Sequence, residues 1–363
     1  MARVVVEGLT KRFGALEAVK DLDLEVKDKE FVCILGPSGC GKTTTLRMIA
    51  GLEKQDEGDI YIGDRKVNDL SPPERDIAMV FQFYAIYPGM TVYDNLAFPL
   101  KQRKMSKPDI ERKVKETAEM LRIDDILNKD AISLTAGEKQ RIALGRAFVR
   151  SPQVFLLDEP LTNLDAGLRA IMRVELKRLQ KEIGQTMIYV THDQLEGMTM
   201  ADRIAVMKSG LLQQYDTPDN LFNRPSNLFV ANFVGSPSMN FLECSYEEEG
   251  ERAKLIFDSY SIDVTRLRDH FRRGGAGKDL ILGIRPTDVA ILKEKGRDSL
   301  IEGKVDVVEL VGDGIIVDVG LGKDIVRAIV PRRFPIKVDE KVWLRFDIDR
   351  LHLFDKQTEK AII

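Results

Sequence analysis

The chain carries Gly36-Pro37-Ser38-Gly39-Cys40-Gly41-Lys42-Thr43, and this octapeptide determines the fold class. It follows the apolar run 31–35, which indicates a buried strand, and precedes a helical pattern at 44–51. The spacing G-x-x-x-x-G-K-[ST] between a strand and a helix is typical of a phosphate-binding loop. A tight Gly-rich connection without function is the alternative, and the complete motif in this context disfavours it. The sequence therefore predicts an α/β nucleotide-binding fold.

Each residue type in this loop suits phosphate binding. Glycines let backbone N–H groups approach phosphate oxygens, and the helix that follows presents the positive end of its dipole. Lys42 supplies a positive charge for the β- and γ-phosphates, and the Thr43 hydroxyl suits Mg²⁺, which prefers oxygen ligands. Cys40 occupies a free position of the motif, where packing is expected rather than reactivity. The expected nucleotide-binding residues are Gly36, Pro37, Ser38, Gly39, Cys40, Gly41, Lys42, Thr43 and Thr44.

Two carboxylates end another apolar run, 154–157, and these are Asp158 and Glu159. Because α/β sheets bind ligands at the carboxyl ends of their strands, Asp158 is expected to orient Mg²⁺ through water. Glu159 is then positioned to polarise the water that attacks the nucleotide. An ordinary surface turn before Pro160 is the alternative, and the phosphate loop makes it less plausible. The pair predicts nucleotide hydrolysis.

The chain from residue 4 to about 235 alternates β-rich runs with helical patterns, which predicts a largely parallel sheet. The residues from about 83 to 150 are mostly helical and include a charged, periodic segment at 107–121. They are expected to form a helical subdomain inserted in the α/β core. The runs expected to be strands buried on both faces are 31–35, 77–81, 154–157 and 186–190.

A second domain is expected after the turn-rich segment 234–238, so the predicted domains are 1–235 and 236–363. Short β runs separated by Gly-rich turns predict an all-β barrel of the OB type, with a flexible loop at 272–278. Trp343 lies in an apolar strand pattern and is expected in the core rather than against a bound sugar. The predicted strands are 254–257, 280–284, 303–310, 315–319, 325–330 and 342–346.

Composition narrows the class of protein. The 363 residues favour two domains, and no apolar run approaches the roughly 18 residues of a membrane-spanning helix. Glu7 comes too early for a secretory signal, so a cytoplasmic location is expected. The net charge of −3 and the interleaved charges disfavour a nucleic-acid-binding surface. Three cysteines without C-x-x-C spacing favour reduced thiols.

A resemblance to the ATP-binding-cassette ATPases rests first on Ser133-Leu134-Thr135-Ala136-Gly137-Glu138-Lys139-Gln140-Arg141. This run resembles their signature motif, ordinarily Leu-Ser-Gly-Gly-Gln, and it also fits an ordinary capping box at a helix start. In the family the motif contacts the γ-phosphate held by the opposite subunit, which implies nucleotide contacts for Thr135, Ala136 and Gly137. Thr135 keeps the hydroxyl of the usual Ser. Ala136 replaces a usual Gly and removes backbone freedom, so the competence of this half-site stays open.

Four further positions match motifs of the same family within residues 9–193. Gln82 matches the Q-loop glutamine, which senses Mg²⁺ and touches the membrane subunit. Asp165 matches the D-loop at the dimer interface, and His192 matches the switch histidine that contacts the γ-phosphate. Phe13 matches the aromatic residue that stacks on adenine. The resemblance implies ATP and Mg²⁺ as cofactors and phosphoryl transfer to water as the reaction, with Lys42, Gln82, Glu159 and His192 as its catalytic residues.

The C-terminal region resembles the accessory TOBE-type domain of importer ATPases, in the segments 283–289 and 351–355. Together with 75–82, these segments are most similar to the maltose-transporter type, which serves oligosaccharides, polyols and glycerol phosphates. Polyamine, iron and sulfate importers use related domains, so a solute other than a sugar stays open. In relatives this domain mediates dimer contacts and sometimes binds regulators, and a simple packing module is the alternative.

The resemblance implies partners at the cytoplasmic face of the membrane. These are a second ATPase subunit, identical or a close paralogue, two integral membrane permease subunits near residues 82–88 and, indirectly, an extracytoplasmic solute-binding protein. A P-loop kinase would lack the signature, Asp165 and His192 in this order, and a non-transport cassette protein usually carries two cassettes or long coiled coils. Ala136 motivates one further alternative, a weakly hydrolytic regulatory half of a heterodimer, although Glu159 and His192 argue against it.

Overall fold

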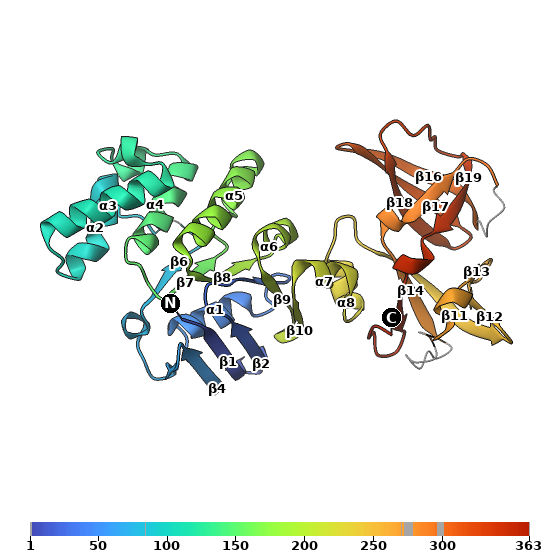
Figure 1. Cartoon of the computed structure of the whole chain (residues 1–363), viewed down its shortest axis with the longest axis horizontal. Coiled ribbons are helices and arrows are strands. Elements are labelled where there is room, and N and C mark those ends of the chain that lie inside the picture. Colours follow the sequence, from blue (N-terminus) through green and yellow to red (C-terminus); the bar gives the residue numbers. More distant parts are fainter. Residues whose placement is uncertain (1, 84, 270, 272–278, 296–300, 363) are drawn as a thin grey trace. The chain divides into compact units, whose positions relative to one another are not determined.

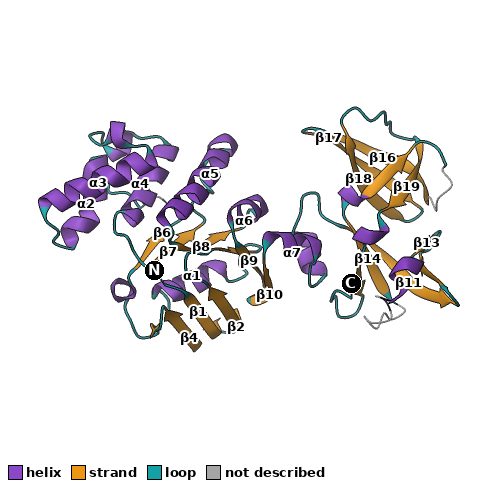
Figure 2. Ribbon diagram, in the orientation of Figure 1, coloured by secondary structure: helices purple, strands orange, loops and turns teal. Residues whose placement is uncertain are grey.

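The computed structural model describes the chain except residues 1, 84, 270, 272–278, 296–300 and 363. The loop predicted at 272–278 therefore lies outside the described residues. The chain forms two compact units, Met1–Asn220 and Leu221–Ile363. Figure 1 follows the chain through both units, and Figure 2 shows that the first contains helices and strands whereas the second is built mainly of strands.

A six-stranded sheet forms the centre of the first unit, in the order β10-β9-β3-β8-β7-β6. The pairs from β9 to β6 are parallel, and β10 is antiparallel to β9. The four runs predicted as buried strands are all present, and every residue of β3, β7 and β8 is buried. The strands are β3 (Phe31–Leu35), β6 (Ile77–Val80), β7 (Val154–Asp158), β8 (Thr186–Thr191), β9 (Arg203–Lys208) and β10 (Leu211–Asp216).

A second, antiparallel sheet in this unit has the order β2-β1-β4-β5. Its apolar side chains share one core with the helix α1 (Lys42–Ala50) and the central sheet. The helix begins at Lys42, earlier than the predicted Thr44, so the loop lysine lies in its first turn. The strands are β1 (Val4–Phe13), β2 (Leu16–Val26), β4 (Glu57–Ile62) and β5 (Arg65–Lys66), and the other helices of the α/β part are α5 (Ala166–Ile183) and α6 (Gln194–Met200).

Three helices form the inserted part: α2 (Val92–Gln102), α3 (Lys107–Leu121) and α4 (Ala136–Phe148). Gly145 lets them pack closely, because a Cβ atom there would lie 2.6 Å from Leu96 Cδ2 and 2.9 Å from Leu121 Cδ1. Thr91 and Ser106 cap α2 and α3 by accepting hydrogen bonds from backbone N–H groups. Within the described residues, no helix has both the length and the apolar character needed to span a bilayer.

The second unit is largely β-structure, as predicted, and contains two five-stranded sheets with the orders β13-β12-β11-β14-β20 and β15-β19-β16-β17-β18. Trp343 is only half-buried, so its predicted place in the core was wrong. It lies on the face of β19 opposite the buried Val342 and Leu344. The strands are β11 (Asn240–Glu249), β12 (Arg252–Ile256), β13 (Ser261–Asp263), β14 (Leu280–Ile284), β15 (Val289–Leu292), β16 (Ile301–Val311), β17 (Gly314–Leu321), β18 (Asp324–Pro331), β19 (Lys341–Phe346) and β20 (His352–Asp355).

A buried arginine attaches the start of the second unit to its sheets. Arg285 is 3% exposed and donates hydrogen bonds to the carbonyl oxygens of Phe222, Ala231 and Val234 at 2.8, 3.2 and 2.5 Å. Burial lowers the pKa of Arg285 to about 10. These bonds hold α7 (Pro218–Asn223) and α8 (Leu228–Phe233) against the strands. The compact second unit, which begins at Leu221, therefore includes α8 and the end of α7.

We expect Arg285→Met to lower the free energy of unfolding of the second unit by about 3 kcal/mol, because buried carbonyl groups lose a charged donor. Urea unfolding followed by Trp343 fluorescence measures this, since Trp343 is the only tryptophan of the chain. Arg252→Met, at an exposed position of β12, is the control. Equal stability of the two variants would contradict the anchoring role.

Candidate functional site

The phosphate loop joins β3 to α1, and its backbone conformation depends on its glycines. Gly39 and Gly41 have φ values of +77° and +104°, which residues with a side chain rarely adopt. A Cβ atom at Gly41 would lie 2.3 Å from the Ala18 carbonyl oxygen, and one at Gly36 would lie 2.4 Å from that of Met207. Cys40 is buried, and burial raises its pKa, so its thiol packs inside the loop. The loop therefore has one shape, and Pro37, Ser38 and Gly39 are its exposed tip.

Lys42 places its ammonium group over this loop. Its Nζ donates hydrogen bonds of 2.9 Å to the carbonyl oxygens of both Gly36 and Pro37, and the residue is 5% exposed. A third hydrogen bond from Nζ goes to Cys40 Sγ at 3.9 Å, and a buried cation held by such neutral groups is a favourable partner for an anion. The loop thus combines an oriented positive charge with a helix N-terminus.

Thr43 and Asp158 meet at the carboxyl edge of the central sheet. The Thr43 hydroxyl donates a 2.9 Å hydrogen bond to Asp158 Oδ1, and Asp158 is 8% exposed at the end of β7. Burial raises the pKa of Asp158, and the hydrogen bond from Thr43 opposes this shift. The structure brings together a hydroxyl and a carboxylate that were predicted from separate motifs, and both are oxygen donors of the kind that Mg²⁺ prefers.

Glu159 and His192 form a second pair beside the first. Glu159 Oε1 lies 3.1 Å from His192 Nδ1, and the other carboxylate oxygen accepts a 3.2 Å hydrogen bond from Thr162. The backbone of Glu159 has a φ of +44°, a strained value for a residue with a side chain. A hydrogen bond from its N–H group to the Val190 carbonyl holds this backbone against β8. The side chains are 17% and 48% exposed, so a solvent molecule can reach both.

The loops that carry Gln82 and Asp165 lie next to this pair. Asn163 donates a 3.0 Å hydrogen bond to the backbone carbonyl of Gln82 and so joins the two loops. Asp165 caps α5 by accepting a 2.9 Å hydrogen bond from the Leu168 N–H group. Hydrogen bonds therefore join the loops that carry Gln82, Glu159 and Asp165.

The signature segment, residues 135–137, and Phe13 do not take part in the contacts described above around the phosphate loop. Thr135 and Glu138 form the predicted capping box at the start of α4, and Ala136 is exposed. Within the part of the chain that the structure describes, no hydrogen bond or ion pair joins residues 135–137 to the phosphate loop. Phe13 is 48% exposed, and Lys11 Nζ lies 5.1 Å from its ring centroid. Both segments offer surface to other molecules.

Family models match three parts of the chain: an ABC transporter model at residues 19–162, a MalK OB fold domain at 235–289 and a TOBE domain at 282–354. A trehalose/maltose import ATP-binding protein from Thermococcus litoralis is 48% identical over the full length of both chains. The chain belongs to the ABC transporter family of ATPases. The match extends over both structural units and excludes an unrelated P-loop kinase.

Other members of the ABC family agree with this assignment. An oligosaccharide import ATP-binding protein from Bacillus subtilis is 44% identical, and a sulfoquinovosyl glycerol transport protein from Agrobacterium fabrum is 46% identical, each over the full length of both chains. A dimeric cassette solved in a post-hydrolysis state with ADP and Pi matches with 33% identity and a TM-score of 0.53, over 59% of this chain and 98% of that one.

Sequence reasoning missed Arg169, which links two loops of the ABC ATPase site. It lies on α5, and its Nη2 donates hydrogen bonds to the carbonyl oxygens of Leu164 and Thr162 at 3.0 and 3.5 Å. Its Nη1 lies 3.5 Å from Asp193 Oδ2, next to His192. Asp193 in turn caps α6. No sequence spacing signals this link, because Arg169 lies outside the motifs and its partners come from two separate loops.

We expect Arg169→Ala to lower ATP turnover roughly tenfold or more, because small displacements of catalytic groups are costly. The effect should fall on kcat and leave ATP affinity nearly unchanged, since Arg169 does not touch the phosphate loop. Steady-state ATPase assays measure both values. Arg178→Ala is the control, because Arg178 on the same helix pairs with the exposed Glu182. A loss of affinity without a loss of kcat would contradict this role.

Proposed function

We propose that this chain is the ATP-hydrolysing subunit of an ABC importer for a sugar, a polyol, or a sugar or glycerol phosphate. The observation that carries the proposal is the convergence of the Thr43–Asp158 and Glu159–His192 pairs beside the phosphate loop, at 2.9 and 3.1 Å. The solute class rests on relatives named for the import of trehalose/maltose, oligosaccharides and multiple sugars.

The proposed roles follow from position and chemistry. Residues 36–44 bind the ATP phosphates, with Lys42 neutralising the β- and γ-phosphate charge. Glu159 orients and polarises the attacking water, and the contact of its Oε1 with His192 Nδ1, at 3.1 Å, fixes the direction of its carboxylate. His192 contacts the γ-phosphate through its exposed edge, and Phe13 stacks on adenine. Catalysis thus comes mostly from positioning and charge.

Thr43, Asp158 and Gln82 are the residues that would hold Mg²⁺. The Thr43 hydroxyl and the Asp158 carboxylate already converge in a hydrogen bond, and an oxygen donor set of this kind fits the ion. When bound, Mg²⁺ neutralises the charge on the β- and γ-phosphate oxygens. Gln82 lies on a loop tied to Asn163, so its amide can follow changes at the neighbouring D-loop.

Two ATPase subunits are proposed to clamp ATP between them. Residues 135–137 and Asp165 would serve the nucleotide on the opposite subunit. In support, the described residues show no hydrogen bond or ion pair between residues 135–137 and this chain's own phosphate loop. A solved cassette similar to this chain is described as dimeric. The partner is a second copy or a close paralogue, and the accessory domain is a further site for dimer contacts or regulators.

A groove of about 560 Å³ offers a place for the permease beside residues 82–88. The Arg146 guanidinium lies 4.0 Å from the Tyr87 ring centroid, and Phe83 is 75% exposed nearby in the sequence. Two integral membrane permease subunits would dock here from the membrane, and the chain would then lie at the cytoplasmic face of that membrane. A solute-binding protein would act on it indirectly, through the permease.

The function test uses two variants of the nucleotide site described above, in the purified chain assembled with its permease. We expect Lys42→Ala to lose ATP binding, because the loop loses its cation. Glu159→Gln should bind ATP but hydrolyse it about 10²-fold to 10⁴-fold more slowly, as expected for a lost general base. Equilibrium ATP binding and phosphate release measure these effects.

The control for Glu159→Gln is Glu182→Gln, an exposed residue of α5 outside the site. Wild-type turnover by Glu159→Gln would remove Glu159 from its role. Measuring turnover by the chain alone and by the assembled complex separates a homodimer from the alternative suggested by Ala136, a weakly hydrolytic half of a heterodimer. If a binding protein loaded with a polyamine, iron or sulfate stimulates ATP turnover and a sugar-loaded one does not, the proposed solute class is wrong.

A further inference from the structure

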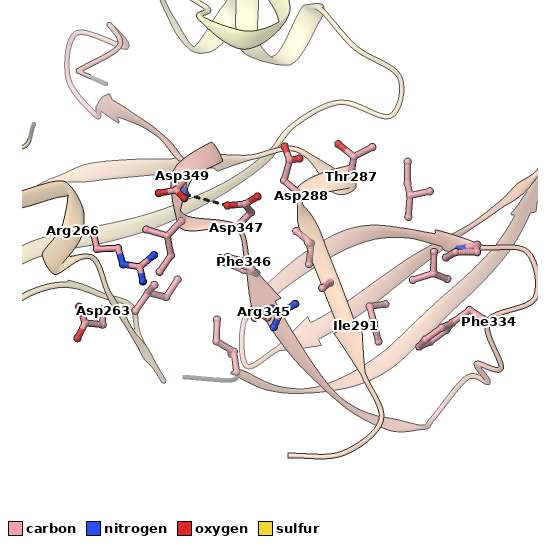
Figure 3. A pocket seen from close by; sticks show the side chains of 18 of the residues that line it. Asp263, Arg266, Thr287, Asp288, Ile291, Phe334, Arg345, Phe346, Asp347 and Asp349 are labelled. Atoms are coloured by element: carbon pink, nitrogen blue, oxygen red, sulfur yellow. Dashed lines mark hydrogen bonds between the residues drawn. The ribbon is translucent and has the colours of Figure 1, made fainter. Parts of the chain in front are cut away.

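A cavity of about 1150 Å³ lies within the second unit and is lined by residues from both of its sheets (Figure 3). One side is formed by β13 and the short helix η4 (Thr265–Leu267). The other side is formed mainly by β15, β18 and β19, together with η5 (Pro286–Asp288) and η6 (Ile348–Arg350). The volume is sufficient for a small-molecule ligand.

The walls of this cavity combine apolar residues with an aromatic ring. Val289, Ile291 and Phe346 are 2%, 6% and 6% exposed and belong to the core of the unit, yet they line the cavity. The ring of Phe334 stands at one side (Figure 3). Such walls favour a ligand that presents C–H groups and ring faces, because these lose little on leaving water.

Charged groups of both signs line the same cavity. Arg266 and Arg345 contribute two guanidinium groups, and for the described residues neither makes a hydrogen bond or an ion pair. The carboxylates are those of Asp263, Asp288, Asp347 and Asp349. Asp347 accepts a hydrogen bond of 3.2 Å from the Asp349 N–H group, and Asp263 accepts one of 2.9 Å from Thr265. Most donors and acceptors therefore remain available to a ligand.

This charge pattern selects a class of ligand. Four carboxylates against two guanidinium groups give the lining an excess of negative charge, which opposes an anion. A hydroxyl group both donates and accepts, so it can bond to a carboxylate and to a guanidinium at once. We propose that this cavity binds a neutral polyhydroxylated compound, a sugar or a polyol. The inference concerns a unit without the phosphate loop and does not depend on the importer assignment.

Trp343 makes the proposal testable in the full-length chain without ATP. It is the only tryptophan, and it lies on the same face of β19 as Arg345, two residues away. The chain is titrated with maltose, trehalose and sorbitol, and separately with glucose 1-phosphate and spermidine. Trp343 fluorescence and calorimetry follow binding. We expect saturable binding of at least one neutral compound, and at least tenfold weaker binding by Arg345→Ala and by Phe334→Ala.

Arg252→Ala is the matched control, because Arg252 lies on β12 and does not line the cavity. It should bind as the wild type does. The unfolding midpoint of each variant shows whether it is folded, and either cavity variant suffices if the other is not. The proposal is overturned if no neutral compound binds, if both cavity variants bind normally, or if glucose 1-phosphate or spermidine binds in preference.

Discussion

The parallel pairing of β7 with β8 is the constraint on which the nucleotide site depends. The register places Asp158 opposite Val190, so both strands end at the same edge of the sheet. The hydrogen bond from the Glu159 N–H group to the Val190 carbonyl extends the pairing one residue beyond β7. Glu159 is thereby turned toward His192, which follows β8. A strained φ at Glu159 is tolerated because the fully buried strands on either side fix the backbone.

The phosphate loop lies at the same edge of the sheet, and close backbone contacts rather than strand pairing fix its conformation. Its glycines are needed because neighbouring backbone from β2 and β9 occupies the space that a side chain would fill, at Ala18 and Met207. The antiparallel sheet therefore does more than cover α1. Its strand β2 contacts the loop at Gly41, and β9 contacts it at Gly36. The Lys42 ammonium group adds hydrogen bonds to the carbonyl groups of Gly36 and Pro37.

Sequence patterns predicted what is local. Four buried strands were identified because a strand covered on both faces is apolar throughout, and the candidate site residues were proposed from short motifs, several of which follow a strand. The strands β1, β2 and β4 were not predicted individually, since their burial alternates or is irregular. The same reason explains Trp343, which shares an apolar run with buried residues but points the other way.

Contacts between distant parts of the chain could not be predicted from sequence patterns. Arg169 joins two loops, and Arg285 bonds to carbonyl groups more than fifty residues away along the chain. Neither has a characteristic spacing, because most of their partners are backbone carbonyl groups that any residue provides. The packing of α7 and α8 was not predicted either, since no pattern shows which neighbour a short connecting helix packs against.

The glycine at position 137 has a mechanical consequence. A Cβ atom there would lie 2.7 Å from Leu168 Cδ2, so the first turn of α4 rests directly on the first turn of α5. Leu168 also donates the N–H group that Asp165 uses as its cap. A pull on one of these helix starts must therefore displace the other. The signature segment and the loop of Asp165, both proposed to face a second subunit, would therefore move together.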